Sequence, residues 1–194
     1  DVNGDAGIDV RYGLSQSMTA DFTYNTDFAQ VEADDAQVNL TRFNLSFPEK
    51  REFFLEGSGT FAFGSGAGGT GGNNSNDVPT IFYSRRIGLS GAREVPVIVG
   101  GRLTGKAGPW GIGVLNMATD DAPAANAEQT NFTVLRLRRD ILGRSAIGAI
   151  YTRRSVSTLS SGANDVYGLD LNLGFYDNLY AAAYIAQSRT ESRG

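Results

Sequence analysis

From residue 8 onward, apolar side chains alternate with small or polar ones. Ile8, Val10, Tyr12 and Leu14 alternate with Asp9, Arg11, Gly13 and Ser15. After a tight turn at residues 16–17, Met18, Ala20, Phe22 and Tyr24 continue the same alternation. Successive side chains of a strand point to opposite faces, so this pattern predicts a sheet with one apolar and one hydrophilic face. Such a sheet is typical of a membrane β-barrel with a water-filled lumen.

Short and long connections alternate between the predicted strands along the chain. Tight turns are expected at 16–17, 107–109, 141–143 and 177–178, and longer polar loops at 64–78, 120–130 and 157–164. Short turns on one side and long loops on the other are the arrangement of outer-membrane barrels, whose tilted strands need about 9–11 residues. The strands are expected near residues 7–15, 18–35, 37–47, 81–89, 95–103, 110–114, 131–140, 144–156, 167–175 and 179–188, with a further apolar stretch at 53–63.

Length and composition narrow the possible functions. The length of 194 residues favours a single domain that spans residues 1–194. No apolar run approaches the roughly 18 residues that a membrane helix needs. It contains neither Cys nor His, so Ser-His-Asp and Cys-His catalysis and the usual zinc sites cannot be built within it. The net charge of −4 argues against nucleic acid as a partner. No cofactor is expected.

A soluble β-sandwich is the alternative all-β architecture, because it also alternates and contains many Gly and Asn turns. A sandwich must fill its interior with the apolar face, and its turns need not sort by length. Here Gly, Asn, Asp, Thr and Arg lie deep within the strands of the polar face, as a solvated lumen allows. The pattern therefore favours an antiparallel transmembrane barrel of roughly eight to eleven strands, and the sandwich stays open.

Four stretches between residues 25 and 88 resemble a family of uncharacterised bacterial proteins. They read NTDFAQVEAD at 25–34, VNLTRF at 38–43, FPEKREFFLEG at 47–57 and FYSRRIG at 82–88. In these domain-of-unknown-function proteins, a sandwich similar to carbohydrate-binding family nine precedes an outer-membrane β-barrel. Thr26 and Glu52 depart from the family, which usually has Pro at both positions.

The resemblance implies a location in the bacterial outer membrane and a chain that is an internal portion of a larger barrel. Its expected partners are outer-membrane lipid and an oligosaccharide or small anionic solute. A channel, or a scaffold that displays a glycan-binding domain, is the predicted function. The stretch at 47–57 is expected to fold into the lumen and narrow it. Aromatic residues near strand ends suit the interfacial girdles of a barrel; they are Tyr12, Tyr24, Phe28, Trp110, Tyr151, Phe175, Tyr176 and Tyr180.

Carboxylates are the remaining candidates for catalysis. Glu49, Glu52 and Glu56 lie around the turn at 48–51, and two carboxylates on facing segments could hydrolyse a glycoside, one protonated and one ionised. The structural interpretation is that they neutralise nearby cations in the lumen, because confined charge is tolerated only when it is paired. These cations are Arg42, Lys50, Arg51, Arg85 and Arg86. The second interpretation is favoured, and a barrel-embedded hydrolase is the alternative.

Arginines on the third predicted hairpin suggest an anion-selective surface. Arg136 and Arg138 alternate with leucines, Arg153 and Arg154 lie on the partner strand, and an Arg-lined pore can hold phosphate or carboxylate groups. A salt-bridge lattice explains the same residues and is favoured; its carboxylates would be Asp140, Asp165 and Asp170. Phe132 and Val134 share the parity of the two arginines, which a β-bulge would resolve.

A calcium-loop interpretation of the first residues is weak. Asp1, Asn3 and Asp5 offer oxygens at alternate positions, but the sixth and twelfth positions are Ala6 and Tyr12 where the motif needs Gly and Glu. A polar turn before the first strand explains these residues equally well. No metal site is predicted.

Overall fold

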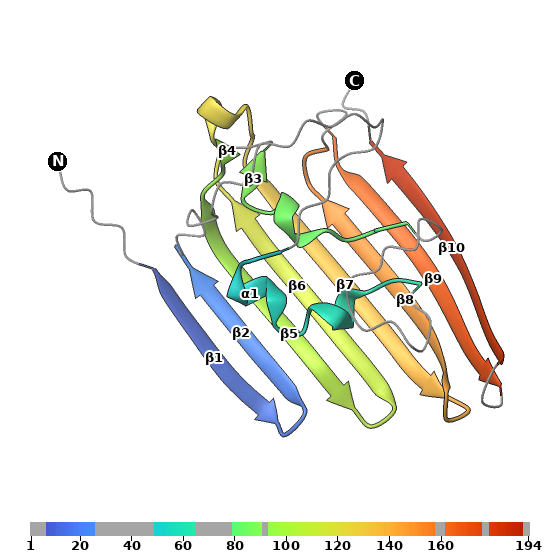
Figure 1. Ribbon diagram of the computed structural model, residues 1–194. Coiled ribbons are helices and arrows are strands. Elements are labelled where there is room, and N and C mark those ends of the chain that lie inside the picture. Colours follow the sequence, from blue (N-terminus) through green and yellow to red (C-terminus); the bar gives the residue numbers. More distant parts are fainter. Residues whose placement is uncertain are drawn as a thin grey trace.

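The computed structural model describes residues 7–25, 49–64, 79–90, 93–157, 162–175 and 179–191, and is dominated by one antiparallel sheet (Figure 1). Within these ranges eight strands pair in the order β1-β2-β5-β6-β7-β8-β9-β10. The strands are β1 Ile8–Ser15, β2 Met18–Tyr24, β5 Val97–Ala107, β6 Trp110–Thr119, β7 Thr130–Ile141, β8 Ser145–Arg154, β9 Asn164–Phe175 and β10 Leu179–Thr190. The predicted all-β antiparallel class is confirmed.

Most neighbouring strands are joined directly as hairpins. The turns predicted at 16–17, 107–109 and 141–143 are confirmed, with Gly108 and Gly143 at φ 59° and 71°. Glycine is suited to both turns because it has no Cβ to clash in the left-handed region. The turn predicted at 177–178 and the strand predicted at 37–47 fall outside the described residues, as does the end of the strand predicted at 18–35.

One long connection interrupts this series. Strands β2 and β5 are hydrogen-bonded neighbours, although residues 25–96 lie between them in sequence. Their junction is closed where Tyr24 pairs with Val99 and the Asn25 N–H donates to the Ile98 carbonyl at 2.8 Å. The connection contains α1 Glu52–Leu55, two 3-10 turns at Ser58–Phe61 and Ser84–Arg86, and the two-stranded sheet of β3 Leu89–Ser90 and β4 Arg93–Glu94.

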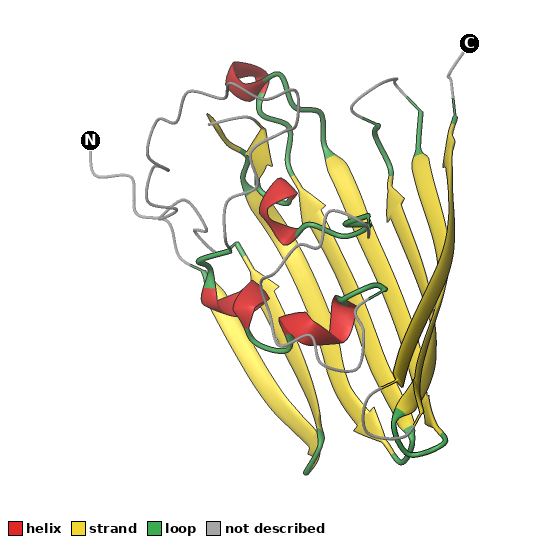
Figure 2. Cartoon of the chain, turned by 45° about the vertical axis from the view of Figure 1, so that its right-hand side comes forward, coloured by secondary structure: helices red, strands yellow, loops and turns green. Residues whose placement is uncertain are grey.

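The described part of this connection covers one face of the large sheet, which curves around it (Figure 2). We call residues 49–64 and 79–90 the inner segment, the face that they cover the inner face, and the opposite face the outer face. The stretch predicted to fold across the lumen therefore lies against the inner face, as far as its residues 49–57 are described. A short 3-10 turn, Pro123–Ala125, lies in the loop between β6 and β7.

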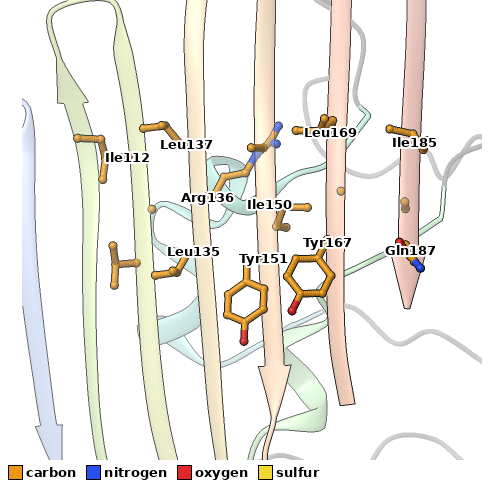
Figure 3. A pocket seen from close by; sticks show the side chains of 15 residues that line it. Ile112, Leu135, Arg136, Leu137, Ile150, Tyr151, Tyr167, Leu169, Ile185 and Gln187 are labelled. Atoms are coloured by element: carbon orange, nitrogen blue, oxygen red, sulfur yellow. The ribbon is translucent and has the colours of Figure 1, made fainter. Parts of the chain in front are cut away.

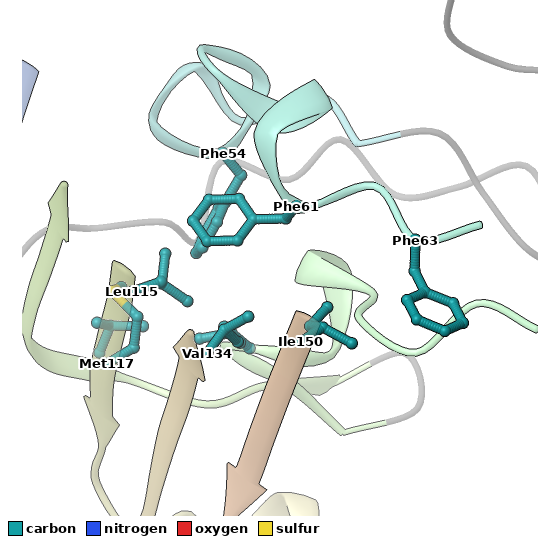
Figure 4. Close-up of a cluster of buried hydrophobic side chains, with 9 residues drawn as sticks. Phe54, Phe61, Phe63, Leu115, Met117, Val134 and Ile150 are labelled. Atoms are coloured by element: carbon teal, nitrogen blue, oxygen red, sulfur yellow. The ribbon is translucent and has the colours of Figure 1, made fainter. Parts of the chain in front are cut away.

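A hydrophobic core lies between the inner segment and the inner face (Figure 4). Side chains of the inner segment meet residues of β5 to β8 there. Its buried members are Phe54, Phe61, Phe63, Ile87, Val97, Leu115, Met117, Val134 and Ile150. The inner face is thus more apolar than the sequence predicted, because it packs against protein along much of its length.

One local prediction was wrong, and the parity problem of the strand at 131–140 has an explanation other than a bulge. Most of the strand expected at 81–89 is irregular chain and a 3-10 turn, and Ile81 and Phe82 pack against the core instead of entering a ladder. Its last residue, Leu89, begins the short strand β3. No bulge occurs in β7, whose register to both neighbours is continuous. Phe132 and Val134 share the inner face with Arg136, because the inner segment supplies an apolar partner to this part of the strand. An irregularity lies in β5, between Val97 and Val99.

The sheet is open in the part of the chain that the structure describes. Its outermost strands β1 and β10 each have one neighbour and are exposed at every residue. Unpaired edges of this length are templates for pairing with further strands. None of the described helices is long and apolar enough to cross a membrane.

Candidate functional site on the inner face of the sheet

Arg102 of β5 connects the sheet to the inner segment. Its guanidinium is buried and pairs with Asp21 of β2, with Nη2 and Nε at 2.6 and 3.1 Å from Oδ2. Nη1 donates to the backbone carbonyls of Phe53 and Glu56. Arg102 and Asp21 are directly opposite in the strand register, so the pair forms without distorting either strand. A buried charge needs both a counter-ion and hydrogen bonds, and Arg102 has them from two parts of the chain.

A second arginine extends this network to the edge strand. Nε of Arg11 in β1 donates to Asp21 Oδ1 at 2.7 Å, and its Nη2 forms an ion pair with Glu56. Asp21 therefore accepts from two arginines, and Glu56 is near both of them. The inner segment is thus bound to three successive strands, β1, β2 and β5, through one charge network.

Arg51 joins the two stretches of the inner segment. Its Nε and Nη2 donate to the two carboxylate oxygens of Glu49 at 2.9 and 2.8 Å, and the backbone carbonyls of Ile87 and Ser84 accept from it at 2.6 and 2.9 Å. Its guanidinium also lies over the Phe54 ring at 4.2 Å. This planar donor fork satisfies a carboxylate and two carbonyls at once, as a lysine could not.

Glu49 is held ionised by this arrangement. Burial alone would raise the pKa of Glu49, but the hydrogen bonds from Arg51 and from the Ser84 hydroxyl (2.6 Å) outweigh it and hold the pKa below its usual value. A general acid of a glycosidase needs the opposite shift. The position of Glu49 therefore supports the ion-pair interpretation of the acidic cluster.

A buried ion pair between Arg136 and Asp170 lies on β7 and β9 across β8. The two groups form a bidentate contact, with Nη2 to Oδ2 at 2.9 Å. Gly148 of β8 lies beneath them, and a Cβ there would be 2.6 Å from Arg136 Nη1. Glycine at this position lets a charged pair cross the intervening strand.

The carboxylates of the predicted salt-bridge lattice are engaged with arginines. Besides Asp170 with Arg136, Asp165 binds Arg153 at 3.2 Å and Asp140 lies 3.6 Å from Arg138. Arg153 has the opposite strand parity to Arg154, so the predicted row of arginines is divided between the two faces. This pairing leaves the arginines poorly placed to form a free anion-binding ladder.

Two further glycines let rings of the inner segment approach the sheet closely. A Cβ at Gly113 of β6 would lie 2.9 Å from the Phe61 ring, and one at Gly168 of β9 would lie 2.7 Å from the Phe63 ring. Phe61 also packs edge-on to Phe82, and Phe63 to Tyr184, with centroids 5.5 and 5.9 Å apart. Hydrogen-bonded arginines and close-packed rings together fix the inner segment in place.

The other predicted site residues are dispersed. Glu52 is exposed in the first turn of α1, Lys50 and Arg86 are exposed, and Arg85 is buried. Arg42 and the weak metal candidates Asp1, Asn3 and Asp5 lie outside the described residues. Within the described ranges, no group of three or more carboxylates is placed to hold a metal ion.

The network residues that sequence reasoning missed are Arg11, Asp21 and Arg102. In the sequence, each of them is a charged residue inside a predicted strand, at a position that faces the hydrophilic side of the sheet. Asp21 and Arg102 are 81 positions apart, however, so only the pairing of β2 with β5 brings them together.

Comparison with known proteins identifies the chain at the level of a family. No curated protein and no solved structure matches it. A domain of unknown function (DUF5916) matches residues 1–140, which contain β1 to β6, the inner segment and most of β7. The chain therefore belongs to the DUF5916 family.

Proposed function

We propose that this chain is part of the wall of an outer-membrane β-barrel that acts as a membrane scaffold and has the inner segment in its interior. The exposed apolar outer face carries this proposal. Leu137, Leu169 and Ile185 are 43%, 56% and 69% exposed, although they lie on adjacent or nearby strands of one face. Contiguous apolar surface of this kind is unusual on a protein surrounded by water, whereas lipid is a suitable neighbour for it.

The outer face also has the layered order of a membrane wall. Val114, Leu135, Tyr151 and Tyr167 are successive partners across β6 to β9, and the next outer-face row toward the long loops is Asn116, Thr133, Arg153 and Asp165. On β9 the apolar outer positions continue from Tyr167 to Phe175. Eight steps of about 3.4 Å give roughly 27 Å along the strand, or about 20 Å at a tilt near 40°. This height is close to the apolar band of roughly 25 Å in such barrels.

The presence of the inner segment is an argument for a barrel of more than eight strands. The interior of an eight-stranded barrel has room for side chains or one small ligand. The inner face here is covered by backbone as well, including α1 and two 3-10 turns. A closed barrel around that content needs strands beyond those described, paired with the open edges of β1 and β10.

The same content favours a scaffold over an open channel. Arg11, Arg51, Arg102 and Arg136 are all engaged with carboxylates, and two of them also bind backbone carbonyls. An anion or oligosaccharide passing along the inner face would have to displace these partners. Display of a glycan-binding domain remains compatible with this architecture and follows from the family resemblance alone.

Trp110, the single tryptophan of the chain, allows a direct test. It is partly exposed at the tight-turn end of β6, with the Arg139 guanidinium 5.1 Å from its ring. The protein would be folded into phosphatidylcholine vesicles, with and without brominated acyl chains, and its emission also measured with acrylamide. We expect strong quenching by brominated lipid and weak quenching by acrylamide. The reverse result, together with a folded protein that needs no detergent, would overturn the proposal in favour of a soluble β-sandwich.

Planar-bilayer recordings test the scaffold assignment separately. With the inner segment bound, we expect little or no steady conductance. Removing the Arg102 anchor by Arg102→Met should raise the frequency of openings, whereas Lys106→Met, at an exposed position on the same strand, should leave it unchanged. Large steady currents from the unaltered protein would show an open channel instead.

A further inference from the structure

Two hollows in the described surface differ in how their arginines are paired. The larger is an apolar groove of about 570 Å³ over β6 to β10 on the outer face (Figure 3). The arginine in its lining, Arg136, is bound to Asp170. The smaller has a volume of about 20 Å³ and lies between the inner segment, the β6–β7 loop, the start of β7 and the end of β8. Arg86 and Arg154 line it, and within the described residues neither forms an ion pair with a carboxylate.

Arg154 is a partly buried cation without a counter-ion in the described part of the chain. It is the last residue of β8 and lies opposite Phe132 of β7, with its guanidinium 5.2 Å from the centroid of the phenyl ring. Its Nε is buried and has no hydrogen-bond partner. Among the described residues, the charge that acts on Arg154 is that of Arg86, and no carboxylate opposes it. Because a buried charge is normally paired, Arg154 is suited to receive an anion from outside the chain.

Arg86 is held beside Arg154 by the backbone of the inner segment. It ends the 3-10 turn Ser84–Arg86, and the carbonyls of Ser84 and Ile87 accept from Arg51 at 2.9 and 2.6 Å. Ile87 is 1% exposed, which fixes this part of the chain against the core. The two like charges are therefore kept together although they repel each other. Their planar donor forks, held at one cavity, form a preorganised site for an oxyanion.

The other polar groups of the cavity leave the two arginines as its available donors. The hydroxyls of Ser90, Thr119 and Thr130 donate to backbone carbonyls at 3.0, 3.2 and 2.7 Å. Glu128 also lines the cavity, but its side chain is exposed and forms no ion pair with either arginine. The described lining thus contains two cations and one carboxylate, which gives it a net charge of +1.

We propose that Arg86 and Arg154 bind one phosphate group on the inner face, at the long-loop end of the sheet. A phosphate monoester carries about −1.5 to −2 charge and three acceptor oxygens, which match two guanidinium groups better than the single charge of a carboxylate. The cavity is only slightly larger than the roughly 10–15 Å³ that one water needs, so it has room for one compact group and excludes a sugar ring. A larger solute would enter with its phosphate alone. The inference is independent of the membrane assignment.

Equilibrium dialysis against radiolabelled inorganic phosphate tests the site, with the folded protein in non-ionic detergent. We expect one phosphate per chain. Arg86→Gln and, separately, Arg154→Gln should each weaken binding by roughly ten-fold or more, because each removes charge-assisted hydrogen bonds. Arg139→Gln is the control, since it removes an exposed arginine at the tight-turn end of β7, and should leave binding unchanged.

Competition experiments identify the ligand more closely. Unlabelled phosphate should displace the label at much lower concentration than acetate does, and equal displacement by acetate would overturn the choice of phosphate. Glucose 6-phosphate separates the two sources of a phosphate group. If it displaces the label as well as inorganic phosphate does, the site takes the phosphate of a larger solute; if it does not, the site takes the free ion.

Urea unfolding separates a ligand site from a purely structural role of Arg86. Without phosphate, Arg86→Gln should be at least as stable as the parent, because it removes the repulsion between two like charges. Phosphate should raise the unfolding midpoint of the parent and leave that of Arg86→Gln unchanged. Three results would overturn the inference: no saturable phosphate binding, an equal loss of binding in Arg139→Gln, or a destabilised Arg86→Gln protein without phosphate. The last would show that Arg86 has a stabilising partner within the chain.

Discussion

The contact between Phe61 and Gly113 gives a quantitative test of whether the inner segment is packed on the sheet. Phe61 is 6% exposed, and removing such a ring by Phe61→Ala should cost about 3–5 kcal/mol of unfolding free energy. A Cβ at Gly113 would be 2.9 Å from the ring and 3.0 Å from the Thr60 methyl, so Gly113→Val should cost about 1–3 kcal/mol by overpacking. In the double variant the valine enters the space that the ring has left.

The double variant should therefore be more stable than the sum of the single effects predicts, by about 1–3 kcal/mol. The measurement is urea unfolding of the protein in vesicles, followed by Trp110 emission on the same strand. Gly101→Val is the control, because a Cβ at Gly101 has no atom within 4 Å. Additivity within about 0.5 kcal/mol would refute the contact, since it would mean that the two positions do not meet in the folded protein.

Three further outcomes follow from the charged groups. Arg102→Met should lower the unfolding free energy measured in urea by about 3 kcal/mol. This is near the lower end for a broken buried ion pair, because Asp21 still pairs with Arg11. Lys106→Met removes an exposed ion pair and should cost only about 0–1 kcal/mol. Arg136→Met should cost about 3–5 kcal/mol, and adding Asp170→Leu should restore most of it; a double variant as unstable as the sum would contradict this assignment. Because the pKa of Glu49 is lowered on folding, its stabilisation is present above the ordinary carboxylate pKa and lost as pH falls through the folded value. Glu49→Gln should thus be less stable than the parent at pH 7, and the gap should close as pH falls through the lowered pKa of the folded state. A gap that does not vary with pH would argue against an ionised Glu49.

The local hairpins could be predicted from the sequence because period-two alternation and tight turns act over short distances. Strands β1 and β9 follow the parity of their apolar residues, and the turns at 16–17, 107–109 and 141–143 are where Gly and polar residues predict them. Alternation failed at 81–89, since Ile81 and Phe82 have the composition of a strand but are buried by packing against a core. Strand propensity and core packing favour the same side chains, so composition could not separate them.

The inner-face network could be predicted only in part. The local pair Glu49 and Arg51 and the lattice carboxylates were among the expected ion pairs, because confined charges need partners. The pairing of Asp21 with Arg102 and the glycine contacts of Phe61 and Phe63 depend on which strands are neighbours. That information lies in the long β2–β5 connection, which alternation within a single strand does not specify.

The closed junction between β2 and β5 makes the inner segment a replaceable insert. Because Asn25 is hydrogen-bonded to Ile98, the chain leaves the sheet and returns to it at one place. Changing the length of the insert alters the closure entropy by only about 0.6 kcal/mol per doubling and leaves the register of the wall unchanged. Joining residues 25 and 98 by a short turn would convert the long connection into an ordinary hairpin. Homologous sheets could therefore exchange the insert together with the inner-face side chains that contact it, and a designer could do the same, without changing the order or register of the strands.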